Sequence, residues 1–289
     1  MINDIKSVLR FSAFRPEPDD SASSWRQRFG HQRTAMVSMG RNTVSFCSLD
    51  RHGVVTEGSS AQGEPKEVLA ELGPLILENT DDGWCSLVLN TRYVISVEHN
   101  LPRKQGSEEA IKSDPRSVLH ARYERGKRYA VTHNPETNSS LLVAYEEENI
   151  RKVEGLFKEQ DLKIGRLCCG AYVLLRYALA ETNKTKGNEN PLSALYIACC
   201  AGSVCALVQE KDNWQELRSR PDVYTAEDMQ PLFDLVSPFQ SRLSPGAGVV
   251  LVADEPIEGL SAKLGEIFPD RPLNDLSREH LLAELVFRN

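Results

Sequence analysis

The sequence lacks the features of a membrane-spanning or exported chain. No run of about eighteen or more apolar residues occurs, and a transmembrane helix needs a run of that length. The first residues also lack the apolar stretch of a secretory signal. We therefore expect a cytoplasmic protein that does not cross a membrane by itself.

Motifs for metal binding and nucleophilic catalysis are missing as well. The chain has seven cysteines and six histidines, but it has neither the CxxC nor the HExxH spacing that gathers zinc ligands. Five cysteines lie inside apolar segments, as buried reduced thiols do: Cys168, Cys169, Cys199, Cys200 and Cys205. No P-loop, GxSxG elbow or GxGxxG after a strand is present. We expect no metal site and no catalytic residues, although a triad that meets only in space stays open.

Excess positive charge is also lacking. Lys and Arg total 34 against 41 Asp and Glu, a net charge of −7, whereas a nucleic-acid partner requires a basic surface. We expect no nucleic-acid partner.

The amino terminus differs from this acidic body. Residues 1–14 alternate apolar and basic side chains at helical spacing, and a Pro-, Asp- and Ser-rich stretch follows to residue 24. Residues 1–33 thus predict a basic amphipathic segment with a linker. Residues 1–14 would make weak contact with anionic lipid; a frayed terminus is the alternative.

The remaining sequence alternates short apolar strands with amphipathic helices, which predicts an α/β fold. In the first half we expect strands at 35–39, 43–49, 54–56, 85–89, 93–97, 139–145 and 166–169, and helices at 65–77, from 146 and at 171–180. A polar section from 102 to 128 is expected at the periphery. The loop 181–190 is the candidate boundary between a first lobe at 34–182, with an inserted subdomain, and a second lobe at 190–289.

The second half repeats the start of the first. At an offset of 160 residues, the strand-turn-strand segment from Ala35 to Val44 lies over Leu195 to Val204, which suggests a duplication. Helices are expected at 225–239, after Gly259 and at 279–287, with a strand at 249–253.

This order resembles the actin-like ATPase superfamily, and in particular the PilM, MshI and GspL-like proteins of type IV pili and type II secretion. Most of the resemblance lies in LLVAYEEENIRKVEGLFKEQDLKIGRLCCGAYVLLRYAL, between Ser140 and Leu179. It implies an actin-like (ribonuclease H-like) duplicated fold with two lobes, whose mixed sheets are flanked by helices.

The nucleotide motifs that the resemblance implies are degenerate here. In the superfamily each hairpin supplies an Asp that organises hydrated magnesium and a Gly that lets amides grip phosphate. The Asp positions fall on Ser38 and Ala198, and Cys200 replaces the second glycine while Gly40 keeps the first. The glycine-rich adenosine turn falls on the segment from Ala253 to Pro256. Only a vestigial cleft is expected, at Gly40, Arg41, Asn42, Gly202 and Ser203, and turn chemistry alone also explains these residues.

The resemblance implies a non-catalytic scaffold, a pseudo-ATPase peripheral to the inner membrane, with no cofactor. Its partner would be the cytoplasmic tail of a PilN-like membrane protein, bound in a groove beside the first lobe; a homodimer is left open. The competing hypothesis is a divergent ATPase or phosphotransferase that binds ATP and magnesium through Asp50, Asp254 or Glu255. A stand-alone actin-like domain is a third hypothesis.

Overall fold

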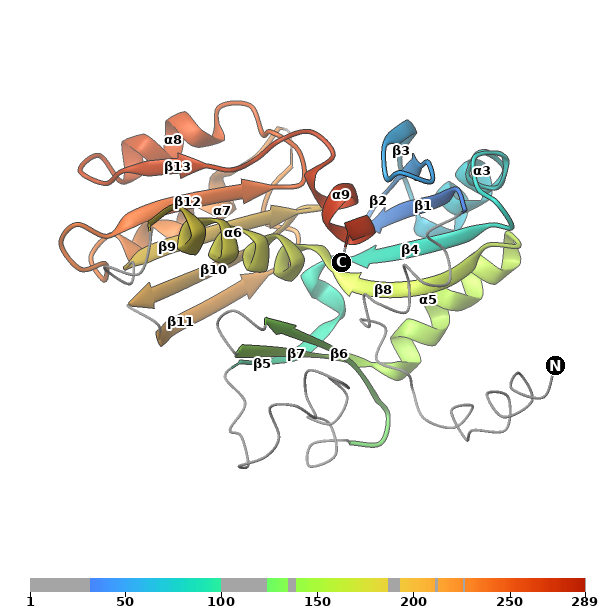
Figure 1. The fold of residues 1–289 in the computed structure, drawn as a ribbon, viewed down its shortest axis with the longest axis horizontal. Helices are drawn as coiled ribbons and strands as arrows, with labels where there is room; N and C mark the ends of the chain where they lie inside the picture. Colours follow the sequence, from blue (N-terminus) through green and yellow to red (C-terminus); the bar gives the residue numbers. More distant parts are fainter. Residues whose placement is uncertain are drawn as a thin grey trace.

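The computed structural model describes residues 32–99, 124–134, 139–186, 193–210, 213–225 and 227–288. The predictions for residues 1–31 and for most of the polar section 102–128 lie outside these ranges. Within them, two five-stranded sheets stand side by side, and a three-stranded sheet lies below their junction in the view of Figure 1. No helix in the described part of the chain is long and apolar enough to cross a membrane.

The first five-stranded sheet has the order β3-β2-β1-β4-β8. β1 (Thr34–Met39), β2 (Thr43–Leu49) and β3 (Val55–Gln62) form an antiparallel meander. β4 (Trp84–Leu89) and β8 (Lys163–Cys169) continue the sheet in parallel with β1. Every side chain of β1 is buried, because this central strand is covered on both faces.

The second sheet repeats this topology with the order β11-β10-β9-β12-β13. β9 (Ala194–Cys200), β10 (Ser203–Glu210) and β11 (Asn213–Arg220) form the meander, and β12 (Gly248–Ala253) and β13 (Leu273–Asp275) run parallel to β9. β1 and β9 begin 160 residues apart, and so do β2 and β10. The predicted duplication is confirmed.

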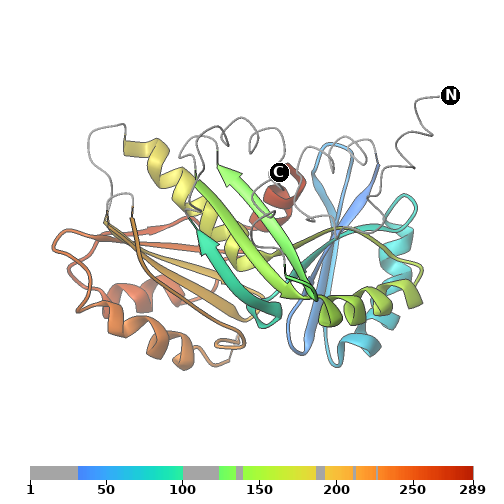
Figure 2. The same cartoon turned by 90° about the horizontal axis from the view of Figure 1, so that it is seen from below.

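The three-stranded sheet is inserted between β4 and the next helix of the first lobe. It has the order β5-β7-β6, from β5 (Val94–His99), β6 (Lys127–Asn134) and β7 (Ser139–Glu146). A short 3-10 helix, η2 (Thr91–Tyr93), leads into it. Figure 2 shows this sheet crossing the junction between the two lobes.

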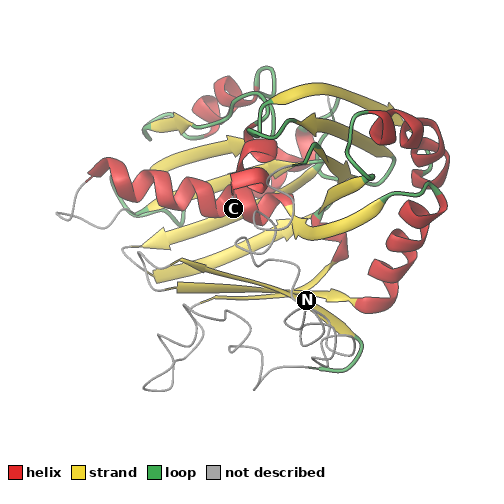
Figure 3. Ribbon diagram, turned by 45° about the vertical axis from the view of Figure 1, so that its right-hand side comes forward, coloured by secondary structure: helices red, strands yellow, loops and turns green. Residues whose placement is uncertain are grey.

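Helices flank the two five-stranded sheets, as Figure 3 shows. α3 (Pro65–Glu78) packs on β2 and β3 and contacts α5 (Glu147–Glu159), which packs on β7 and β8. Of the four residues that the sequence predicts for one buried face of α3, Val68, Leu72 and Ile76 are buried, whereas the prediction for Leu75 is wrong because this side chain is 39% exposed. α7 (Gln230–Val236), extended by the 3-10 helix η5 (Ser237–Phe239), and α8 (Leu260–Ile267) bury their apolar faces in the core of the second lobe.

Two further helices connect the lobes. α6 (Gly170–Lys186) follows β8 of the first sheet but packs mainly on β9, β12 and β10 of the second. α9 (Leu281–Arg288) follows the second sheet but contacts α6 and β2. Each lobe therefore ends in a helix that contributes to the packing of the other.

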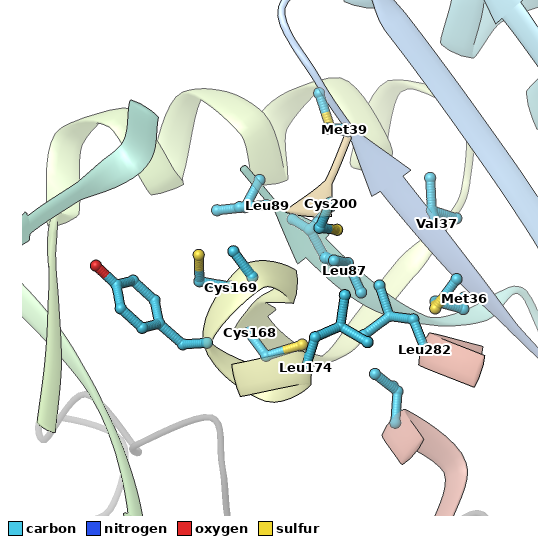
Figure 4. Packing of buried hydrophobic residues seen from close by; sticks show 14 of the residues in the cluster. Met36, Val37, Met39, Leu87, Leu89, Cys168, Cys169, Leu174, Cys200 and Leu282 are labelled. Carbon is cyan, nitrogen blue, oxygen red and sulfur yellow. The ribbon is translucent and has the colours of Figure 1, made fainter. Parts of the chain in front are cut away.

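The lobes share one continuous core as a result. Figure 4 shows Met36 and Leu87 of the first sheet, Cys200 of the second, Leu174 of α6 and Leu282 of α9 packed together. A second apolar cluster lies on the other face of the second sheet, against α7 and α8. Because the central cluster is shared, separating the lobes would expose apolar surface on both.

Several boundaries differ from the sequence-based expectations. β3 runs to Gln62 rather than ending at residue 56, and β6, β11 and β13 were not predicted. The expected loop 181–190 is in part helix, because α6 continues to Lys186. The division of the chain into lobes at 34–182 and 190–289 stays a prediction.

The helix expected from residue 225 begins only at Gln230. Thr225 instead accepts hydrogen bonds from the amides of Glu227 and Asp228 in a turn. Pro231 explains the late start: it is tolerated in the first turn of a helix, but farther inside it removes a hydrogen bond and clashes with the preceding turn.

Candidate functional site

The candidate site lies where the β1–β2 and β9–β10 hairpins meet. The second hairpin turns through Ala201 and Gly202, with φ values of 47° and 76°. Two central residues of positive φ define a type I′ turn, which suits a two-residue hairpin. Gly202 adopts this conformation freely, whereas Ala201 is strained by about 1–2 kcal/mol. Contacts around Ala201 must therefore hold the turn in place.

The first hairpin directly approaches the second. A Cβ atom placed on Gly40 would lie 3.3 Å from the carbonyl oxygen of Ala201 and 2.5 Å from Oγ1 of Thr43. Gly40 also donates its amide hydrogen to the carbonyl of Thr43, at 2.9 Å. The glycine thus permits a close backbone approach between the lobes. Separation that small leaves no room for a phosphate group between Gly40 and Ala201.

Asp254 follows β12, and its carboxylate is hydrogen-bonded to a backbone amide in the turn of the second hairpin. Its Oδ2 accepts a hydrogen bond from the Ala201 amide at 3.3 Å, and its Oδ1 accepts one from the Glu255 amide at 3.1 Å. The Cys200 thiol also donates to this carboxylate. Burial raises the pKa of Asp254 to about 6 from an ordinary value of 3.8, against the effect of these hydrogen bonds.

A carboxylate of the protein itself therefore holds an amide of the kind that binds phosphate in such hairpins. Because this carboxylate also supplies negative charge at the turn, it should repel a nucleotide phosphate.

The residues at the two expected Asp positions are buried and carry no charge. Ser38 is 5% exposed, and its hydroxyl has no hydrogen-bond partner among the described residues. Ala198 is fully buried and faces the shared core. Neither side chain can replace the carboxylate that organises a hydrated magnesium ion.

Contacts between the lobes continue beside the hairpins. The Thr91 amide donates to the buried hydroxyl of Ser203 at 3.1 Å. Arg92 pairs with Asp222 at 2.6 Å between Nη2 and Oδ2, and Asn90 Nδ2 lies 3.5 Å from the other oxygen of that carboxylate. Asp222 itself has a positive φ of 54°. Residues after β4 of the first lobe thus bind β10 and the loop after β11 of the second.

The five residues predicted for the vestigial cleft fall into two groups, three at the junction of the lobes and two at an exposed hairpin tip. Gly40, Gly202 and Ser203 lie where the lobes meet, and the Ser203 hydroxyl is engaged by Thr91. Arg41 and Asn42 are exposed at the tip of the first hairpin. That these residues form a vestigial anion site stays a prediction.

Asp50 and Glu255 lie in different settings. Asp50 accepts hydrogen bonds from the amides of His52 and Val54, at 2.8 and 2.9 Å, so it stabilises the β2–β3 turn. The Val54 hydrogen bond is the largest cause that lowers its pKa. Glu255 is exposed. The pKa of Cys47 in the first lobe is raised to about 12, mainly by the burial of its thiol and to a smaller extent by the negative charge of Glu255. Among the described residues, no group of three or more His, Cys, Asp or Glu could hold a metal ion.

Sequence reasoning missed the contacts of Asn90, Thr91, Arg92 and Asp222. Their one local signal was the polar run Asn90-Thr91-Arg92 directly after an apolar strand. Their partners are more than a hundred residues away, so no local pattern could pair them.

Comparison with known proteins gives the fold class. No protein-family model matches the sequence, and no curated protein matches it significantly. Solved structures do match. A Bacteroides thetaiotaomicron protein with an actin-like ATPase fold has a TM-score of 0.51 at 10% identity, over 89% of this chain and 96% of that one. The chain has the actin-like fold, as predicted.

Two other structures with this fold belong to the systems that the resemblance named. The PilM–PilN type IV pilus biogenesis complex matches with a TM-score of 0.56 at 15% identity, over 84% of this chain and 88% of that one. The cytoplasmic domain of EpsL, an inner-membrane component of the Vibrio cholerae type II secretion system, matches with a TM-score of 0.51 at 11% identity, over 88% and 92%. The resemblance to PilM and GspL-like proteins is confirmed at the level of the fold.

Proposed function

We propose that this protein is a non-catalytic scaffold of a type IV pilus or type II secretion-like assembly at the inner membrane. The observation that carries the proposal is the closed junction of the two hairpins. Gly40 lies against the Ala201 carbonyl, and Asp254 occupies the Ala201 amide. A protein that keeps the actin-like fold without space or charge for nucleotide phosphates retains its surfaces for binding partners.

The partner is the cytoplasmic tail of a PilN-like membrane protein. The PilM–PilN complex, which shares this fold, supports a partner of that kind. We place the tail on β5, an edge strand of the three-stranded sheet. The β5–β7 register shifts between Val94 and Ser96, and Ile95 at this irregularity is 50% exposed. Among the described residues no strand pairs with the other side of β5, and such an edge beside an apolar side chain suits an extended peptide, whose backbone adds to the sheet while one side chain contacts Ile95.

Binding of tail peptides tests this proposal. Titration of synthetic cytoplasmic tails of PilN-like proteins into the full chain should show saturable binding that is unchanged by ATP and magnesium. Ile95→Glu should weaken it at least about tenfold, because a buried carboxylate replaces an apolar contact. Leu75→Glu on α3, at a position 39% exposed, is the matched control and should bind normally. Loss of binding in both variants, or in neither, would place the partner elsewhere.

The competing function is a divergent ATPase or phosphotransferase. It would have to use Asp254 and Glu255 for magnesium, and Asp254 is already hydrogen-bonded to two backbone amides. Peptide binding that requires ATP and magnesium would favour this alternative over the scaffold.

A further inference from the structure

β5, the strand on which we place the partner tail, is joined to the first five-stranded sheet by a very short connection. Only Asn90 lies between β4 and η2, and η2 runs directly into β5 at Val94. The Asn90 side chain accepts the Arg92 amide at 3.2 Å, and the Asn90 amide donates to the Met39 carbonyl of the first hairpin at 3.2 Å. Because no loop separates η2 from β5, the position of η2 fixes where β5 begins.

The second lobe holds η2 through two contacts. The buried Ser203 hydroxyl accepts the Thr91 amide at 3.1 Å, and Asp222 pairs with Arg92 at 2.6 Å. The ion pair is partly shielded from water, because the Arg92 and Asp222 side chains are 39% and 24% exposed. Asp222 has a φ of 54°, a conformation that a residue other than glycine keeps only when its surroundings hold it there. Asp222 and η2 therefore hold each other in place across the junction of the lobes.

The start of β5 is shaped so that this position matters for a bound tail. Val94 and Val97 are half-buried against the core that both lobes share, whereas Ile95 is 50% exposed. The register shift between Val94 and Ser96 comes directly after η2, and irregularities of this kind change the direction of a side chain. The direction of Ile95, which we expect to contact the tail, thus depends on where η2 is held.

We propose that the second lobe positions β5 for the partner tail through Ser203 and Asp222, and that tail binding and these contacts between the lobes stabilise each other. The inference rests on the proposed function, because it concerns the same β5 site. Ser203 and Asp222 are positioning residues, since they act on the site through η2. Coupling of this kind is reciprocal: if the contacts favour tail binding, the bound tail favours the contacts to the same degree.

A double-mutant cycle on the Arg92–Asp222 pair tests the positioning. In titrations of the synthetic PilN-like tails into the full chain, Arg92→Met and Asp222→Gly should each weaken binding about threefold, and glycine adopts the positive φ at position 222 freely. The double variant should bind no more weakly than either single variant, because both changes remove the same contact. Arg33→Met removes the ion pair with Asp81 just before β1; it is the matched control and should bind as the wild type does.

Hydrogen–deuterium exchange tests the reciprocal effect. In the wild type, a saturating tail peptide should slow exchange in the second-lobe segments 201–204 and 221–224 as well as in β5. In Asp222→Gly, at peptide concentrations that again saturate the site, β5 should still be protected by the peptide, whereas the two second-lobe segments should exchange as they do without it.

The outcomes separate this inference from the proposed function. If the wild type binds no tail, the proposed partner is wrong and the coupling is wrong with it. If the wild type binds a tail and Asp222→Gly leaves the affinity unchanged, only the positioning is wrong. The positioning is also wrong if the two substitutions multiply in the double variant, or if the bound tail leaves exchange in the second lobe unaltered.

Discussion

Asp254 is the residue at which this chain departs most from a nucleotide-binding hairpin pair. Its carboxylate accepts the Ala201 amide and the Cys200 thiol, and it lies at the strained turn of the second hairpin. The resemblance to the actin-like superfamily implies that Asp254 stands where a glycine-rich adenosine turn would be. In the structure its carboxylate accepts the Ala201 amide of the neighbouring β9–β10 hairpin in the same lobe. The same side chain thus holds the Ala201 turn, and its negative charge is expected to oppose a phosphate there.

Asp254 should make stability depend on pH. Burial raises its pKa to about 6 in the folded protein, so the folded state holds the proton more tightly than the unfolded chain. The resulting stabilisation is fully present below about pH 4 and is lost as pH rises through about 6. Asp254→Asn lacks this dependence while its amide oxygen can still accept the Ala201 hydrogen bond. Relative to wild type, the variant should gain about 1 kcal/mol in free energy of unfolding between pH 5 and pH 7.5.

Urea denaturation at the two pH values measures this difference. A constant gap between the variant and the wild type, or a gap that shrinks at the higher pH, would contradict the assigned environment of Asp254.

Substitution of Gly40 tests whether the two hairpins approach each other closely. Gly40→Ala should lower the free energy of unfolding by about 1–3 kcal/mol, because the new methyl group overlaps Thr43 and presses on the Ala201 carbonyl. Gly155→Ala in the exposed middle of α5, where nothing lies within 4 Å, is the matched control. It should instead stabilise by about 0.5–1 kcal/mol through its helix propensity.

Chemical denaturation of the two variants compares them. Combining Gly40→Ala with Thr43→Ala removes the overlap with the Thr43 side chain, so the remaining cost reports the Ala201 contact. No remaining cost would mean that the hairpins are farther apart than the structure shows.

At the scale of elements, the sequence predicted those whose signal is local. The strand-turn-strand runs of β1–β2 and β9–β10 and the helices α3 and α5 were predicted because the signal of each is contained in one short window. β11 was missed because Asn213 to Arg220 is largely polar, and β13 because it has three residues. The pairing of Thr91 with Ser203 and of Arg92 with Asp222 depends on tertiary structure. The resemblance gave the residues of the candidate site. The close approach of Gly40 to Ala201 depends on tertiary structure and could not be read from the sequence.

Arg166 anchors the last helix to the first lobe. This buried side chain of β8 donates to the carbonyl of Val286, in the last turn of α9, at 2.6 Å. Arg166→Met should cost about 2–3 kcal/mol, because a charge-assisted hydrogen bond at a helix carboxyl end is lost. Arg278→Met removes the exposed ion pair with Glu284 at the start of the same helix and should cost no more than about 1 kcal/mol.

Hydrogen exchange followed by mass spectrometry distinguishes these variants. In Arg166→Met, residues 281–288 should exchange faster while β9 and β12 keep their protection. Equal exchange of α9 in both variants would show that Arg166 does not hold this helix.

At the scale of the whole molecule, the two lobes behave as one unit. They share a core that includes α6 and α9, and the hairpins, the Thr91–Ser203 hydrogen bond and the Arg92–Asp222 pair connect them. Actin-like proteins that work by nucleotide binding need an accessible space between their lobes. In this chain Gly40 lies close to the Ala201 carbonyl, and Asp254 accepts the Ala201 amide, and on these two contacts the proposed scaffold role depends.

Isothermal titration of ATP with magnesium into the full chain tests this closure most directly. A thermal-shift scan at millimolar nucleotide supports it, since a ligand that binds the folded state raises the melting temperature by mass action. The account predicts no binding heat and no shift. Saturable binding at submillimolar ATP, lost when magnesium is removed, would contradict the closed junction and would place this protein among the nucleotide-dependent members of the actin-like fold.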